Sequence, residues 1–186
     1  VHYRNDLAVS ANNIIFITDS QSNKVYKIDR PSNDIEVFIN SEEIPNCNGI
    51  TISDNDQYLY LATDRGIGVV DISSKKILNV PQDQFSSIDG LKFHQNNLYG
   101  IVNAWGDSTL NGLFKFNLND NLTEVVSNDR LVEFTEEFII PTTFDIFDGH
   151  IYFIMNTQLG NLDTNTNEII DLSTLESYKM LKINIE

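Results

Sequence analysis

The sequence predicts an all-β fold, a β-propeller of four-stranded antiparallel blades, with about four of six blades present in 186 residues. Three observations support this prediction. The same order of short apolar runs recurs about every 40 residues. The runs are rich in Ile, Val, Tyr and Phe, as strands are. An Asn or Asp stands at the same place in successive units.

The repeat can be measured at the start of each unit. Asn5 and Asn48 are 43 positions apart, and Asn48 and Asp89 are 41 apart. The fourth unit follows after 53 positions, at Thr142, which indicates an insertion between residues 128 and 140. A β-sandwich also contains many short strands, but it does not repeat one motif at one place in every unit. The spacing therefore favours a propeller.

Turn residues separate the apolar runs, and they define the expected strands. Only residues 172–178 could form a short helix, with Ser173 or Thr174 as its cap. The expected strands are 5–9, 14–19, 25–29 and 35–39 in the first unit, 48–52, 58–64, 67–71 and 76–80 in the second, 89–93, 98–103, 113–117 and 122–126 in the third, and 141–144, 151–156 and 180–184 in the fourth.

These units form one propeller domain over residues 1–186, and its blades are expected at 1–43, 44–83, 84–135 and 136–186. The fourth unit has three expected strands, and a strand from the other end of the chain often completes the last blade of a closed ring. We therefore expect about two opening blades to lie outside these residues. Unpaired blade edges invite pairing, so self-association through them is also expected.

Composition narrows the classes of partner. The net charge of −15 disfavours nucleic acid and anionic membrane surfaces, which attract clustered Lys and Arg. No apolar run approaches the roughly 18 residues of a membrane helix, so no membrane insertion is expected. Cys47 is the only cysteine, which excludes an internal disulfide and a cysteine-rich zinc site.

The repeated polar residues are candidate metal ligands. Asn5, Asn48 and Asp89 each precede the first strand of a blade, and such positions converge at the mouth of a propeller channel. Calcium takes six to eight oxygen ligands and accepts amides and carboxylates alike. The alternative is that all three residues only form Asx turns. The pattern therefore predicts a calcium or other divalent-cation site, with turn formation as the competing interpretation.

Several segments also resemble a known family. Residues 4–9 with 16–20, then 45–50, then 88–91, look like successive blades of the senescence-marker-protein, gluconolactonase and regucalcin family. Residues 141–159 resemble a last blade of bacterial propellers loosely grouped with that family. The resemblance implies a six-bladed propeller that binds one catalytic divalent cation in its channel.

The resemblance also implies roles for individual residues. Asn48 and Asp89 match two metal ligands, and Asn5 matches a residue that contacts the metal or the substrate. Asp6 would contact the ligands and not the metal itself. A further Glu ligand is expected in the opening blades. The implied reaction is hydrolysis of a lactone or similar ester, a small-molecule substrate, with Asp89 also considered as base or nucleophile.

Two questions stay open at this point. Trp105 follows a strand that ends at the mouth, where it could form a substrate wall or only pack at the rim. A propeller can also serve as a non-catalytic binding protein, because fold alone does not decide function.

Overall fold

The structure is a computed structural model that describes residues 2–79, 81, 86–103, 108–136 and 138–185. In this part of the chain the only helices are single 3-10 turns, η2 (Ser108–Leu110), η3 (Leu159–Asn161) and η4 (Leu172–Thr174). The strands are β1 (Arg4–Val9), β2 (Ile14–Asp19), β3 (Lys24–Asp29), β4 (Asp34–Asn40), β5 (Ile50–Ile52), β6 (Tyr58–Thr63), β7 (Gly66–Asp71), β8 (Lys76–Ile77), β9 (Ile88–His94), β10 (Asn97–Val102), β11 (Gly112–Leu118), β12 (Val125–Glu133), β13 (Phe144–Phe147), β14 (His150–Ile154), β15 (Leu162–Asp163), β16 (Glu168–Ile169) and β17 (Met180–Asn184).

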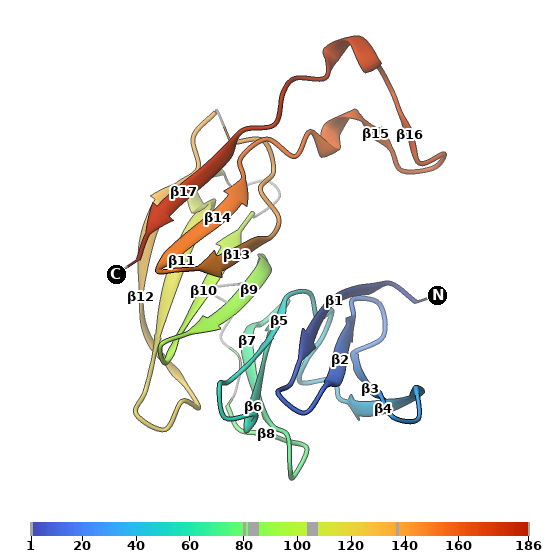
Figure 1. Cartoon of the computed structure of the whole chain (residues 1–186), viewed down its shortest axis with the longest axis vertical. Coiled ribbons are helices and arrows are strands. Elements are labelled where there is room, and N and C mark those ends of the chain that lie inside the picture. The colour runs from blue at the N-terminus through green and yellow to red at the C-terminus, as the bar shows by residue number, and fades with distance from the viewer. Residues whose placement is uncertain (1, 80, 82–85, 104–107, 137, 186) are drawn as a thin grey trace.

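The strands form successive antiparallel meanders, which confirms the predicted all-β propeller. Three sheets have four strands each, in the orders β1-β2-β3-β4, β5-β6-β7-β8 and β9-β10-β11-β12. The fourth sheet has three strands, β13-β14-β17, so the expected strand at 180–184 does pair there. Figure 1 shows the sheets fanning around a centre, and the first strands of neighbouring blades contact one another.

Left-handed turn residues set the hairpins. Asn13, Asp56 and Asn96 have φ values of 61°, 57° and 59°, each between the first and second strand of its blade. Asn and Asp tolerate this conformation because their short side chains bond locally. Turn residues therefore separate the first two strands of these blades, as the sequence predicts, and the left-handed residue is Asn or Asp in each.

The core lies between blades. Alternate residues of each strand point to opposite faces, so every inner blade presents one apolar face to each neighbour. Three clusters fill the three blade junctions. Their largest fully buried side chains include Phe16, Ile50, Leu59 and Leu61 at the first junction, Tyr60, Leu91, Leu98 and Phe116 at the second, and Ile101, Leu113 and Ile151 at the third.

Two expected elements differ from the structure. The last strand of the third blade begins at Val125 and ends at Glu133, not at 122–126, because Asn119 organises a turn. Its side-chain oxygen accepts from the Thr123 N–H at 2.9 Å, and Leu122 has a φ of 61°. The short helix is only the single turn η4, and its cap is Asp171 rather than Ser173 or Thr174.

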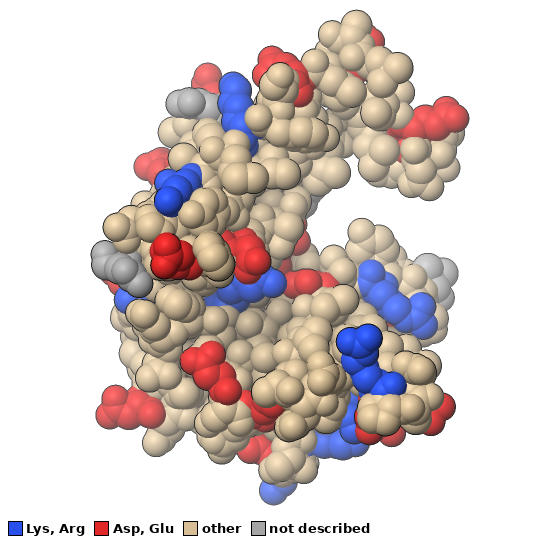
Figure 2. Space-filling view, in the orientation of Figure 1, with Lys and Arg blue, Asp and Glu red and all other residues tan. Residues whose placement is uncertain are grey.

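The fourth blade carries a long excursion between its second and third strands. It holds η3, the two-stranded hairpin β15–β16 and η4, and Figure 1 shows it projecting away from the sheet. In Figure 2 an open notch separates this excursion from the first blade. Within the described residues, no helix is long and apolar enough to cross a membrane.

Candidate channel-mouth site

The starts of the first strands bring Asn5, Asp6, Asn48 and Asp89 to one place. A hollow of about 410 Å³ at the channel mouth is lined by Tyr3, Asn5, Asp6, Asn48, Asp89, Gly90, Thr142, Thr143 and Leu159. A second hollow of about 320 Å³ shares Asn5, Asn48 and Asp89 with the first and extends to Ser20, Asp64 and Asn103. The three candidate ligands, and Asp6 with them, therefore border a common space.

Glycine makes this convergence possible. A Cβ on Gly49 would lie 2.2 Å from the carbonyl oxygen of Asp89, and a Cβ on Gly90 would lie 2.8 Å from that of Thr142. The Gly90 N–H also donates to the Thr142 oxygen at 2.7 Å. Neighbouring first strands thus touch backbone to backbone. An Asn-Gly or Asp-Gly pair places a polar side chain at the mouth and lets the next strand approach.

In the first blade a carboxylate stands where the second blade has glycine. Asp6 follows Asn5 as Gly49 follows Asn48. Its side chain accepts hydrogen bonds from the Leu7 N–H at 2.8 Å and from the Ile50 N–H at 3.3 Å. Asp6 therefore ties the first blade to the second and leaves a negative charge beside the hollow.

Hydrogen bonds fix the positions of Asn5 in the first blade and of Asn48 between the first and second blades. The Asn48 carbonyl accepts from the Thr18 hydroxyl at 2.7 Å, and its N–H donates to the Ala62 carbonyl at 2.8 Å. The Asn5 side chain donates to the Ser20 hydroxyl at 3.0 Å. This last bond engages the amide nitrogen of Asn5, so its amide oxygen is the atom suited to accept from a ligand or bind a cation.

Asp89 is the most perturbed acid of the hollow. Burial raises its pKa, and the charge of Asp6 raises it further, while hydrogen bonds from Asn103 and Asn48 oppose the shift. Asn103 donates to the Asp89 carboxylate at 2.8 Å and to the Pro141 carbonyl at 3.1 Å. From the sequence, Asn103 ends a second strand and faces the same mouth, with a turn role as the favoured expectation. Its place at the end of β10, beside the start of β9, was the signal that could have paired it with Asp89.

Two other residues that end second strands, Asp64 and Asn156, hold neighbouring segments together. The Asn46 side chain donates to the Asp64 carboxylate. Asn156 is buried, donates to the Ser177 carbonyl at 3.1 Å and accepts from the Lys179 N–H at 2.7 Å. Asn156 thereby joins the two ends of the excursion of the fourth blade.

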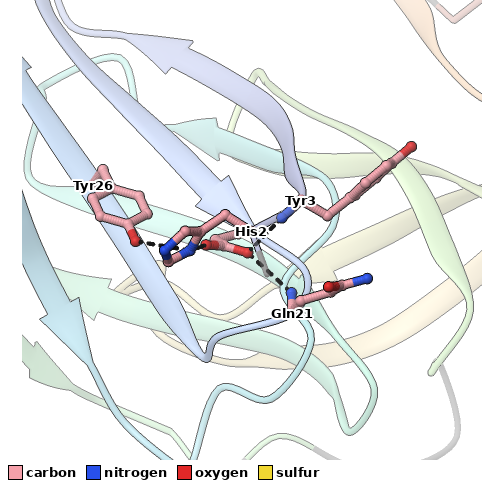
Figure 3. A network of polar contacts seen from close by, with 5 residues as sticks. His2, Tyr3, Gln21 and Tyr26 are labelled. Atoms are coloured by element: carbon pink, nitrogen blue, oxygen red, sulfur yellow. Dashed lines mark hydrogen bonds and ion pairs between the residues drawn. The ribbon is translucent and has the colours of Figure 1, made fainter.

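Asp19 ends β2 and contacts His2, Tyr3 and Gln21, which are labelled in the polar network of Figure 3. Its side chain has no exposed surface. It accepts from the Tyr3 and Gln21 N–H groups at 3.1 Å each, and it lies 2.7 Å from Nδ1 of His2. Burial alone would raise its pKa, but the Ser22 and His2 side chains and these two N–H groups outweigh burial and hold the pKa well below its usual range. The network anchors the N-terminal residues beside Tyr26, whose hydroxyl lies 3.4 Å from His2.

We expect Asp19→Asn to lower the stability of the fold by about 1.5–3 kcal/mol at neutral pH, because it weakens hydrogen bonds to a buried charge. The direction in which the stability changes with pH follows from the lowered pKa. The contribution of Asp19 is present above the pKa of an unfolded aspartate and is lost as pH falls towards the folded value. Urea unfolding of both proteins at neutral and acidic pH tests this, and the difference between them should shrink in acid. A difference that is independent of pH would contradict it.

Among the described residues, no three His, Cys, Asp or Glu side chains gather closely enough to hold a metal by themselves. The mouth offers a mixed set instead, the carboxylates of Asp6 and Asp89 and the amides of Asn5 and Asn48. Trp105, the other predicted substrate contact, lies outside the described residues. Cys47 is buried, and burial raises its pKa to about 12, so it is a packing residue and not a nucleophile.

Comparison with known proteins shows the fold. No protein-family model and no curated protein matches the sequence. Solved structures do match. A protein from Lactobacillus plantarum aligns at a TM-score of 0.63 with 12% identity, over 98% of this chain and 59% of that one. A chain of the nidogen–laminin complex aligns at a TM-score of 0.62 with 17% identity, over 89% of this chain and 61% of that one.

An enzyme is also among the similar structures. Virginiamycin B lyase from Staphylococcus aureus aligns at a TM-score of 0.59 with 18% identity, over 82% of this chain and 48% of that one. The chain therefore spans about half to three-fifths of the length of these structures. At such identities the likeness shows a β-propeller fold and does not reach the level of a family.

Proposed function

We propose that the channel mouth binds a divalent cation, with calcium favoured, and that the protein is a metal-dependent hydrolase of lactones or similar esters. The observation that carries the proposal is the shared hollow of Asn5, Asp6, Asn48 and Asp89. The resemblance of residues 4–9, 45–50 and 88–91 to the gluconolactonase family gives the reaction class.

The chemistry of the donors fits a hard cation. All four side chains offer oxygen, and calcium prefers carboxylate and amide oxygens. Burial and the charge of Asp6 make ionised Asp89 unfavourable, and a cation would offset both effects. Asn103 holds one carboxylate oxygen of Asp89 in place, as partners of metal ligands commonly do.

A cation at this place would polarise the substrate carbonyl as a Lewis acid. The residues of the chain supply the remaining functions. Asn5 would position the substrate through its amide. Asp89 would act as the general base that takes a proton from the attacking water. Asn103 would orient that carboxylate.

A binding protein without turnover is the second candidate. One of the structures with a similar fold is a complex of two proteins, nidogen and laminin, so a fold of this kind can take part in a protein complex.

Calcium and substrate measurements separate these candidates. We expect calcium to raise the melting temperature, and we expect an aldonolactone or aryl ester to be hydrolysed with calcium and not in excess EDTA. Calcium stabilisation without hydrolysis would favour the binding protein. If calcium changes neither the melting temperature nor the hydrolysis rate, the metal site itself is wrong. Magnesium at the same concentrations is the control for cation selectivity.

A further inference from the structure

The fourth blade adds one more position to the channel mouth. Gly49 lies against the carbonyl oxygen of Asp89, and Gly90 lies in the same way against the carbonyl oxygen of Thr142. The Gly90 N–H also donates to that oxygen at 2.7 Å. Thr142 therefore occupies in the fourth blade the place that Asp89 occupies in the third, and it lines the same hollow as Asp89.

The backbone that leads to this threonine is held on both sides. Asn103 donates to the Asp89 carboxylate at 2.8 Å and to the Pro141 carbonyl at 3.1 Å, so one side chain joins the third blade to the start of the fourth. From the other side, the Thr157 hydroxyl donates to the Ile140 carbonyl at 2.8 Å. The position next to Pro141 is therefore fixed relative to the carboxylate of Asp89.

The four polar residues already assigned to the mouth mainly offer oxygen atoms. The carboxylates of Asp6 and Asp89 can only accept hydrogen bonds when they are ionised. The amide nitrogen of Asn5 donates to the Ser20 hydroxyl at 3.0 Å, and the Asn48 side chain donates to Asp89. This set favours a cation, and both of its amide groups already donate hydrogen bonds within the protein.

Thr142 supplies a donor beside these oxygen atoms. A hydroxyl group is both donor and acceptor and carries no charge. Thr142 is partly buried, and its side chain makes no hydrogen bond to another described residue, so its O–H can serve a ligand. Thr143 and Tyr3 also bring hydroxyl groups to the hollow, but both residues are exposed, Tyr3 by 57%. Of these three residues, Thr142 is the one that stands at the position of Asp89.

We propose that the Thr142 hydroxyl donates a hydrogen bond to the carbonyl oxygen of the ester as negative charge develops on it, which makes Thr142 a further catalytic residue. This inference rests on the function proposed above. The oxygen of the attacking water bonds to the carbonyl carbon, the π electrons of the carbonyl move to its oxygen, and a water proton passes to Asp89. When the intermediate collapses, the ester C–O bond breaks and the departing alkoxide takes that proton. Thr142 keeps its own proton, and its hydrogen bond strengthens as the charge forms.

The kinetics of Thr142→Val on an aryl ester in the presence of calcium test this role. Valine keeps the shape of threonine and removes the hydroxyl, so kcat should fall by about a hundredfold. KM should change little, because the lost interaction forms mainly in the transition state. Thr142→Ser keeps the hydroxyl and should recover most of kcat. Thr164→Val is the matched control, because Thr164 is exposed in the turn between β15 and β16.

Two binding measurements separate a donor from a metal ligand. Thr142→Val should keep the calcium-dependent rise in melting temperature of the wild type, because in this proposal the hydroxyl contacts the substrate and not the cation. A phosphonate analogue of the ester carries negative charge like that of the intermediate. In calorimetry it should bind the wild type at least about tenfold more tightly than Thr142→Val.

A lower kcat with an unchanged calcium response, recovered by serine, supports the assignment. A kcat of Thr142→Val within about threefold of the wild-type value would overturn it and leave the proposed hydrolase intact. Loss of the calcium response in this variant would also overturn it, since Thr142 would then hold the cation. A wild-type chain that hydrolyses no ester with calcium would overturn the proposed function itself, and this inference with it.

Discussion

Gly49→Ala is expected to lower the stability of the protein by about 3 kcal/mol, at the upper end of overpacking effects. The added Cβ would meet the Asp89 carbonyl oxygen at 2.2 Å and the Leu91 backbone nitrogen at 3.0 Å. Neither atom belongs to a flexible side chain, so β5 and β9 must separate. In a domain of this size the loss corresponds to a fall of about 6–12 °C in melting temperature.

Moving β5 away from β9 would also displace residues at the channel mouth. Asp89 begins the segment that has to move, so Gly49→Ala should also weaken any effect of calcium on melting. Gly160→Ala is the control, since a Cβ at Gly160 meets nothing within 4 Å. Thermal and urea melts of the two variants are the measurement. Equal melting temperatures for both would show that the first strands are not packed backbone to backbone.

The repeat made the architecture predictable, because each blade uses the same local chemistry. Asn13 and Asn96 adopt left-handed conformations between strands, where the sequence predicts turn residues. The spacing from Asn5 to Asn48 to Asp89 also placed three polar residues at one end of neighbouring strands. Local turn preferences and a fixed period are properties of short segments, and short segments can be interpreted without tertiary information.

Contacts between segments were harder to predict. The sequence did not link Asn103 to Asp89, since 14 residues and a β-bulge separate them. It also did not show that Asp6 bonds the Ile50 N–H, which depends on how closely two blades approach. The late start of β12 was missed because the Asn119 turn continues through residues that have ordinary strand propensity.

The two faces of the first blade illustrate the same distinction. Consecutive apolar residues in β1 and β2 predict two apolar faces for that sheet. Which face has a neighbour depends on the ring, and only the structure shows that Leu7 and Val37 are exposed while Phe16 is covered.

Asp89→Asn should reverse the order of stability between wild type and variant when calcium is added. Without calcium the variant should melt higher, because the folded environment raises the pKa of Asp89 and so disfavours its charge. This direction follows from the linkage between proton binding and folding. A raised folded pKa favours the fold at low pH, and this advantage is lost as pH rises through that pKa. At neutral pH the amide that replaces the Asp89 carboxylate has the same shape but no charge, so the variant does not lose this stability. Its oxygen can still accept a hydrogen bond from Asn103.

With calcium the wild type should overtake the variant. At 100 times its dissociation constant, a ligand that binds only the folded state adds about 2.7 kcal/mol, or about 5–11 °C here. Asp89→Asn removes one of the two carboxylates of the first hollow, so the variant should gain little. Asp120→Asn makes the same charge change at an exposed turn and should behave as wild type. Melting temperatures in EDTA and across a calcium titration give all the values needed. An equal calcium response in wild type and Asp89→Asn would leave Asn5, Asn48 and Asp89 as turn residues. It would also remove the main support for a hydrolase, because without a cation no positively charged group identified at this mouth would polarise a substrate carbonyl.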